Sequence, residues 1–184
     1  MMRMKLEVLL ALWVLAASNI AAAQEQSAEE LAKKAQNPIA SMISVPIQSN
    51  INFDWGPEEG TFAVTNIQPV LPFKLNDDWN IVTRTILPIV TQPRISPEQG
   101  RKTGTGDTLF TAFFVPADSG AWTWGVGPAI QLPTTSNSRL GADEWGVGAS
   151  FVALTMPGRW VLGGLVSNVW GISEDPGNDV NVFT

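Results

Sequence analysis

The sequence predicts an all-β fold, an antiparallel up-and-down transmembrane β-barrel of about seven to eight strands, preceded by a signal peptide and a short helix. Three observations favour this fold. Apolar side chains alternate with small or polar ones over stretches long enough for a strand to cross a bilayer. Short turns alternate with long loops along the chain, so in a barrel the short turns would lie at one rim and the long loops at the other. A tryptophan follows each short turn.

The clearest alternation lies in residues 122–134. One face carries Trp122, Trp124, Val126, Pro128, Ile130, Leu132 and Thr134, and the other carries Thr123, Gly125, Gly127, Ala129, Gln131 and Pro133. Successive side chains of a strand point to opposite faces, so this period of two indicates a strand. Strands of soluble proteins are usually about five or six residues long, whereas a strand that crosses a bilayer needs about nine to eleven. A hairpin arm of a soluble β-sandwich would alternate in the same way, so this segment alone leaves both folds open.

The composition excludes several classes of function. The chain of 184 residues fits one domain and contains neither Cys nor His. Disulfides, Cys/His zinc sites and His-dependent catalytic triads are therefore excluded. The net charge of -6 comes without a basic cluster. Nucleic acid is not expected as a partner, because phosphate binding depends on clustered Lys and Arg.

Residues 1–23 have the three parts of a secretory signal peptide. Arg3 and Lys5 form the charged start, the apolar run extends from Val8 to Ala17, and residues 21–23 are small alanines suited to cleavage. The run is too short to cross a membrane comfortably, and no stop-transfer charges follow it. The sequence therefore predicts export.

A short periplasmic helical arm is predicted over residues 24–42. Ser27 and Glu30 form a capping box, and Glu29 precedes Lys33 by the four residues that favour an ion pair on a helix. Few apolar residues line this helix, so we expect a solvated arm.

Residues 43–184 are expected to form the barrel. The predicted strands span residues 43–55, 62–75, 79–91, 107–116, 121–134, 144–156 and 160–171. Residues 178–184 barely supply an eighth strand. A barrel must close, because an open strand edge in lipid leaves backbone groups unpaired. The barrel is therefore expected to be incomplete and the chain to be truncated. The alternative is a minimal eight-stranded barrel, which would need the last segment to extend to membrane length.

The connections between these strands differ in length. Short turns at residues 76–78, 117–120 and 157–159 alternate with longer loops, above all residues 91–106 and 135–143. Trp79, Trp122 and Trp160 each follow a short turn. An indole ring has an apolar body and one N–H donor, so it favours the membrane–water boundary. These three residues are the predicted aromatic girdle; the alternative is that Trp is simply a favourable strand residue.

Several motifs resemble a known bacterial family. They are Gln36–Pro46, Asn66–Val70, Leu75–Asn80, Arg84–Pro88, Gly106–Asp107, Trp124–Pro128 and Ala153–Gly158. Over roughly residues 35–170 the chain resembles an outer-membrane family often mislabelled neuromedin U, which is similar to the outer-membrane transporters of phenol-degradation operons with a MetA-like pathway. The resemblance implies an outer-membrane β-barrel with a role in transport, and it supplies no catalytic motif. Usual members continue past the end of this chain and add strands.

Five polar residues are predicted to face the lumen. They are Asn66, Gln68, Arg84, Asp107 and Gln131. Arg84 is the most informative, because an arginine facing lipid near mid-membrane costs about 2–4 kcal/mol. It would either line a pore or pair with a carboxylate, such as that of Asp107, and help to fill the interior.

No catalytic residue, cofactor or metal site is predicted, and the protein is not expected to be an enzyme. The Gly-rich segment 102–107 lacks the Gly-Lys-Ser/Thr end of a phosphate loop. The acidic residues Glu174, Asp175 and Asp179 lack the alternating ligand spacing of a calcium loop.

The function expected from these observations is a passive channel or transport component for small solutes in the outer membrane of a Gram-negative cell. A non-conducting structural or adhesion barrel and a soluble secreted β-sandwich that acts as a binding module remain as alternatives. The expected partners are outer-membrane lipid, the barrel-assembly machinery and a small solute of unknown identity. A dimer that completes the sheet is left open.

Overall fold

The computed structural model describes residues 39, 41–96, 98–158, 160–172 and 181–183. The predicted signal peptide and nearly all of the predicted arm lie outside these residues. The barrel region belongs to one compact unit, Pro38–Thr184. The described residues contain no helix, hence none that is long and apolar enough to cross a membrane.

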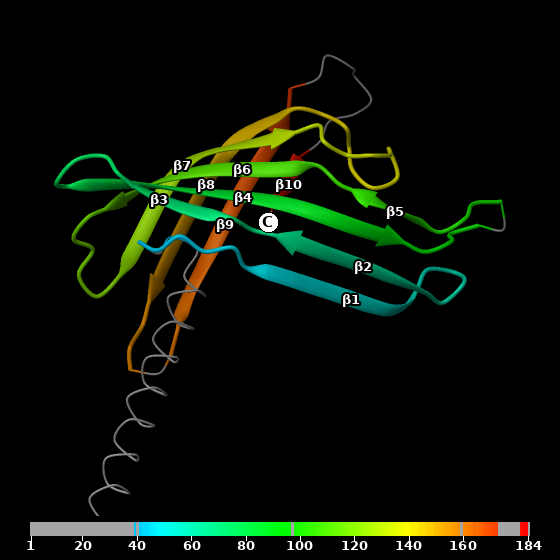
Figure 1. Ribbon diagram of the computed structural model, residues 1–184, viewed down its shortest axis with the longest axis horizontal. Helices are drawn as coiled ribbons and strands as arrows, with labels where there is room; N and C mark the ends of the chain where they lie inside the picture. The colour runs from blue at the N-terminus through cyan, green and yellow to red at the C-terminus, as the bar shows by residue number, and fades with distance from the viewer. Residues whose placement is uncertain (1–38, 40, 97, 159, 173–180, 184) are drawn as a thin grey trace, which may run out of the picture. The chain divides into compact units, whose positions relative to one another are not determined.

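One antiparallel sheet contains all ten strands of the described residues (Figure 1). The strands are β1 (Ile47–Trp55), β2 (Gly60–Ile67), β3 (Val70–Lys74), β4 (Trp79–Gln92), β5 (Lys102–Thr105), β6 (Thr108–Pro116), β7 (Thr123–Leu132), β8 (Gly146–Thr155), β9 (Leu162–Gly171) and β10 (Asn181–Phe183). Neighbours follow the order β1-β2-β4-β6-β7-β8-β9-β10, so the chain forms an up-and-down meander. The predicted all-β antiparallel fold is confirmed.

Two pairs of short strands each act as one longer strand along β4. β2 and β3 keep the same register against β4, as the pairs Asn66↔Pro88 and Val70↔Arg84 show. β5 and β6 differ by one residue in their register against β4, which places a β-bulge at Gly106 and Asp107. Over the part of the chain that the structure describes, the meander therefore has eight strands, in line with the seven predicted strands and the partial eighth.

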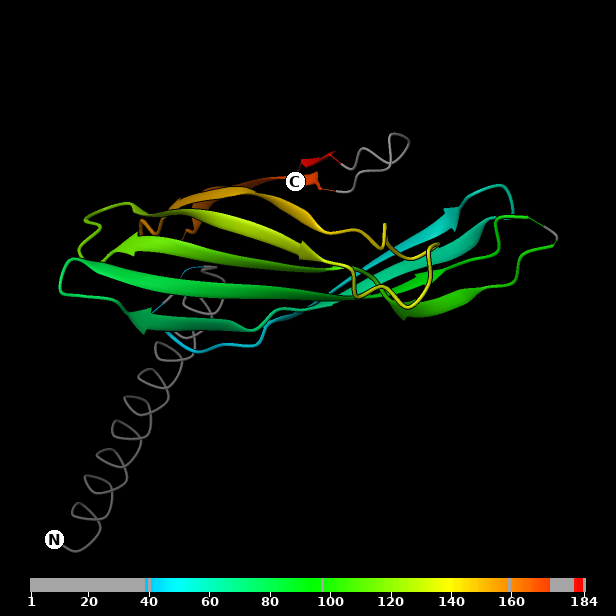
Figure 2. The same cartoon turned by 90° about the horizontal axis from the view of Figure 1, so that it is seen from above.

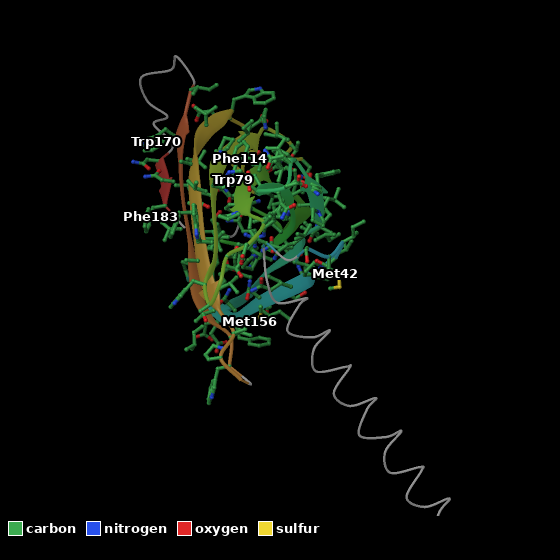
Figure 3. The ribbon with its side chains drawn as sticks, turned by 90° about the vertical axis from the view of Figure 1, so that its left-hand side faces the viewer. Met42, Trp79, Phe114, Met156, Trp170 and Phe183 are labelled. Carbon is green, nitrogen blue, oxygen red and sulfur yellow. The ribbon has the colours of Figure 1, made fainter. Side chains whose placement is uncertain are left out.

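The sheet curls into a half-barrel (Figures 2 and 3). Within the described part of the chain, β1 pairs only with β2 and β10 only with β9. The sheet has a concave side, here called the inner face, and a convex side, called the outer face. Because side chains alternate along each strand, the pairing register assigns every strand residue to one of these two faces.

The hydrophobic core lies on the inner face, towards the short turns. It consists of Val70, Val82, Phe113, Val115, Val152 and Leu154 together with Ile39, which precedes the first strand. Backbone hydrogen bonds between Ser44 and Val70 anchor the segment that follows Ile39 to the start of β3. The inner face is therefore apolar at the short-turn end. The sequence analysis predicted polar residues for this face, further along the strands, and did not predict the apolar end.

Glycine permits the close approach of strands on the inner face. A Cβ at Gly127 would lie 1.7 Å from the carbonyl oxygen of Ala112, and one at Gly148 would lie 1.8 Å from that of Asn168. Both glycines belong to the repeated Trp-Gly-Val-Gly sequence on neighbouring strands β7 and β8. The sheet can adopt this local geometry only because these positions have no side chain.

Candidate functional site on the inner face

A chain of polar side chains crosses three strands in the middle of the inner face. Arg84 on β4 donates a hydrogen bond from Nη2 to Oε1 of Gln68 at 2.6 Å. Gln68, which is buried between β2 and β3, donates from Nε2 to Oε1 of Gln48 on β1 at 3.2 Å. The strand break at Gln68 is stabilised by its backbone N–H, which donates to the carbonyl of Pro46. The curled sheet thus brings together two of the five predicted lumen residues.

The surroundings of Arg84 are neutral. Its partners in register are Val70 on β3 and Thr111 on β6, and both are buried. Within the part of the chain that the structure describes, Arg84 forms no ion pair, and its recorded hydrogen bond goes to Gln68. The guanidinium is therefore a half-buried positive charge among uncharged neighbours.

Asp107 does not pair with Arg84, so that sequence-based hypothesis is wrong. Its carboxylate accepts hydrogen bonds from the backbone N–H groups of Thr135 (3.2 Å), Ala142 (2.6 Å) and Asp143 (3.1 Å). Arg84 lies opposite Thr111, four residues from Asp107, which is about 13 Å along a strand. The bulge directs the carboxylate towards the long loop after β7.

This loop, residues 133–145, folds against the inner face at the β5–β6 bulge. The backbone N–H of Ser136 donates to the carbonyl of Thr105 at 3.0 Å, and Thr134 Oγ1 accepts from the N–H of Thr108 at 2.9 Å. The buried Leu140 lies over Gly104 and Gly106, where a Cβ at either glycine would collide with it. Sequence reasoning missed this contact, although two glycines in one strand region signal a close approach.

The other two predicted lumen residues also lie on the inner face, towards the long-loop end relative to Arg84. Asn66 on β2 pairs in register with Gln48, and Gln131 at the end of β7 donates from Nε2 to the carbonyl of Glu144 at 3.5 Å. A hydroxyl pair that the sequence analysis did not single out, Ser150 and Ser167, is buried between β8 and β9 with 2.6 Å between the oxygens. The middle of the inner face is therefore lined by amides and hydroxyls.

The outer face carries tryptophans at both rims. Trp79 makes an edge-to-face contact with Trp124, with ring centroids 6.0 Å apart, while Trp122 and Trp160 are exposed by 53% and 72%. Trp145 and Trp170, which sequence reasoning did not assign, lie near the opposite rim and are about half exposed. Their signal was available, because each has the strand parity of the outer face.

The chemistry offered by the middle of the inner face is hydrogen bonding and the positive charge of Arg84. The groups are a guanidinium, side-chain amides and hydroxyls, which bind polar solutes without covalent change. In the described residues there is no cluster of three or more His, Cys, Asp or Glu that could hold a metal ion. The predicted acidic loop around Glu174 lies outside the described residues.

A comparison with protein families shows which family the chain matches. The family model described as putative MetA-pathway of phenol degradation matches residues 44–171, well over half of the chain. The matched segment extends from the residues that anchor β3 to the end of β9, so it includes the polar chain, the bulge and the long loop. Comparisons with curated proteins and with solved structures gave no match.

Proposed function

We propose that this chain, which belongs to the family described as putative MetA-pathway of phenol degradation, is an outer-membrane β-barrel protein that provides a passive path for small solutes along its inner face. Outer-membrane lipid and the barrel-assembly machinery are its partners in this proposal. No covalent step is involved, and solutes diffuse past the polar side chains in the middle of the sheet.

The observation that carries the proposal is the position of the exposed apolar side chains. Every exposed large apolar side chain within strands β2 to β9 lies on the outer face. They are Leu71, Phe73, Leu87, Ile89, Phe114, Val126, Val147, Phe151, Leu162, Val166 and Trp170, the last of which points away from the concave side in Figure 3. An apolar band facing outward and a polar interior are the arrangement that a lipid bilayer stabilises. A soluble β-sandwich would need a second sheet against this face, and no other described segment covers it.

The spacing of the outer tryptophans supports the same orientation. Trp160 and Trp170 lie ten residues apart along β9 and its approach, which is about 33 Å at about 3.3 Å per residue. A strand tilted by about 35–45° would then separate them by about 25 Å across the bilayer, the height of the apolar band of outer-membrane barrels. The predicted girdle residues Trp79, Trp122 and Trp160 would lie at one boundary, with Trp145 and Trp170 near the other.

A non-conducting structural barrel is the second candidate, and a specific observation favours it. Ile39 packs with Val82, Phe113 and Val152 on the inner face near the short turns, so apolar side chains fill part of the interior there. Small barrels are commonly filled by their own side chains. The two candidates differ in whether solutes pass.

The test combines location with permeability. The full chain, expressed with its own N-terminus in a Gram-negative host, is expected in the outer-membrane fraction after a urea wash and to migrate faster on a gel before boiling than after. Liposomes that contain the folded protein are expected to swell in small sugars. Recovery in the soluble fraction would contradict the membrane location, and folded protein without swelling would favour the structural barrel.

A further inference from the structure

Arg84 brings an uncompensated positive charge to the middle of the inner face. A guanidinium has five N–H donors and no acceptor, and among the described residues Arg84 makes a single hydrogen bond, to Gln68. Burying part of a charge is costly unless a partner of opposite charge or several hydrogen bonds compensate. The donors of this half-buried side chain that have no partner in the described residues are not themselves buried, so they are available to an anion.

The nearby carboxylates do not neutralise this charge. Asp107 is engaged by three backbone N–H groups of the long loop. Glu144 lies two residues before β8, where a Cβ at Gly171 of β9 would meet its carboxylate oxygens. Both belong to the long-loop end of the sheet, whereas Arg84 is flanked by Val70 and Thr111.

Gln68 holds the guanidinium in one orientation. Its amide nitrogen is bound to Gln48, so its oxygen is turned to Arg84. Because Gln68 is buried, this pair of hydrogen bonds restrains the guanidinium at Nη2. The remaining N–H groups of the guanidinium are left for a ligand. A restrained guanidinium loses less conformational freedom when it binds.

We infer that Arg84, oriented by Gln68, binds a small organic monocarboxylate on the inner face. The planar guanidinium matches a carboxylate by two parallel hydrogen bonds, and one positive charge balances one negative charge. A phosphate dianion would leave a charge unbalanced among neutral neighbours. The inference rests on the proposed function in that the bound carboxylate represents the solute class that passes along this face.

The experiment measures equilibrium binding of benzoate to the full chain folded in detergent, with benzyl alcohol as the uncharged probe. Wild-type protein is expected to bind benzoate in preference to benzyl alcohol. Arg84→Gln is expected to weaken benzoate binding about tenfold or more, because a charge-assisted hydrogen bond is lost. The control Arg94→Gln removes a guanidinium that pairs with Glu58 outside the polar chain and should leave the affinity unchanged.

Equal affinity of wild type for benzoate and benzyl alcohol would overturn the inference without any variant, so the test holds even if Arg84→Gln fails to fold. Arg84→Lys, which keeps the charge but not the planar fork, should bind benzoate several-fold more weakly than wild type. Unchanged affinity in a folded Arg84→Gln would also overturn it.

Bilayer conductance separates this inference from the proposed function. If both wild type and Arg84→Gln conduct ions and bind benzoate with the same affinity, the carboxylate site is refuted and the solute path is not. Benzoate binding that depends on Arg84, in a folded protein that conducts no ions, would support the site and refute the path.

Discussion

Asp107 on the β5–β6 bulge accepts a hydrogen bond at 2.6 Å from the backbone N–H of Ala142, which lies 35 residues later in the chain. With the bonds from Thr135 and Asp143, it ties both ends of the long loop to one carboxylate. The loop is therefore held against the inner face by a residue outside the loop, at the rim where the proposed path along the inner face would end.

The first prediction concerns this carboxylate. Asp107→Asn replaces one acceptor oxygen with an NH₂ group and should release the loop, at a cost of about 1–3 kcal/mol for the backbone donors left without a partner. Trypsin should then cut after Arg139 in the loop faster than in wild type. Asp118→Asn, at a short turn where the side chain accepts one long hydrogen bond, is the control and should leave cleavage at Arg139 unchanged.

A second prediction tests the close approach of β6 and β7. Gly127→Ala would place a methyl group against the Ala112 carbonyl oxygen and should destabilise the folded protein by about 1–3 kcal/mol, because backbone must move. Gly164→Ala on β9 is the matched control, since its Cβ would meet nothing within 4 Å. Equal urea midpoints for the two variants would show that β6 and β7 are not too close at Gly127 to accept a methyl group.

The third prediction uses the two tryptophans in contact on the outer face. A double-mutant cycle of Trp79→Phe and Trp124→Phe should give a coupling energy of about 0.5–1.5 kcal/mol from urea unfolding, as for other edge-to-face pairs. The corresponding cycle of Trp79→Phe with Trp160→Phe should give a value near zero, because Trp160 is largely exposed. Coupling of equal size in both cycles would mean that the observed ring contact is not its source.

A fourth prediction distinguishes lipid from water around the outer face. Phe151 lies in the middle of β8 and Trp145 just before it, both exposed on the outer face. In a membrane, Phe151→Arg should cost about 2–4 kcal/mol and Trp145→Arg about 0–1 kcal/mol, because the cost of charge depends on depth. The measurement is refolding yield into liposomes over a urea series. On a water-exposed surface the two costs would be alike and small.

The strands could be predicted because their signal is local. In β7 the alternation of Trp124, Val126 and Ile130 with glycine and alanine is visible in the sequence, and the structure places the two sets on opposite faces. Short turns such as residues 76–78 were equally clear, since Asn76 accepts hydrogen bonds from the N–H groups of Asp78 and Trp79 within the turn itself.

What could not be predicted depends on contacts between distant residues. β5 lies in a segment assigned to a loop, because Thr103, Gly104 and Thr105 have no apolar alternation and become a strand by pairing with β4. The hypothesis that Asp107 pairs with Arg84 was wrong for a related reason. The bulge that contains Asp107 can be recognised only from the register of β5 and β6 against β4. The packing of Ile39 into the core likewise requires the curl of the sheet.

The most direct test of the solute path is the conductance of a planar lipid bilayer to which the purified, folded full chain is added. The proposal predicts stepwise increases of current in potassium chloride, each from the insertion of one conducting unit. Protein that is folded and membrane-inserted, as judged by its gel mobility before and after boiling, but that produces no steps would contradict the proposed path along the inner face.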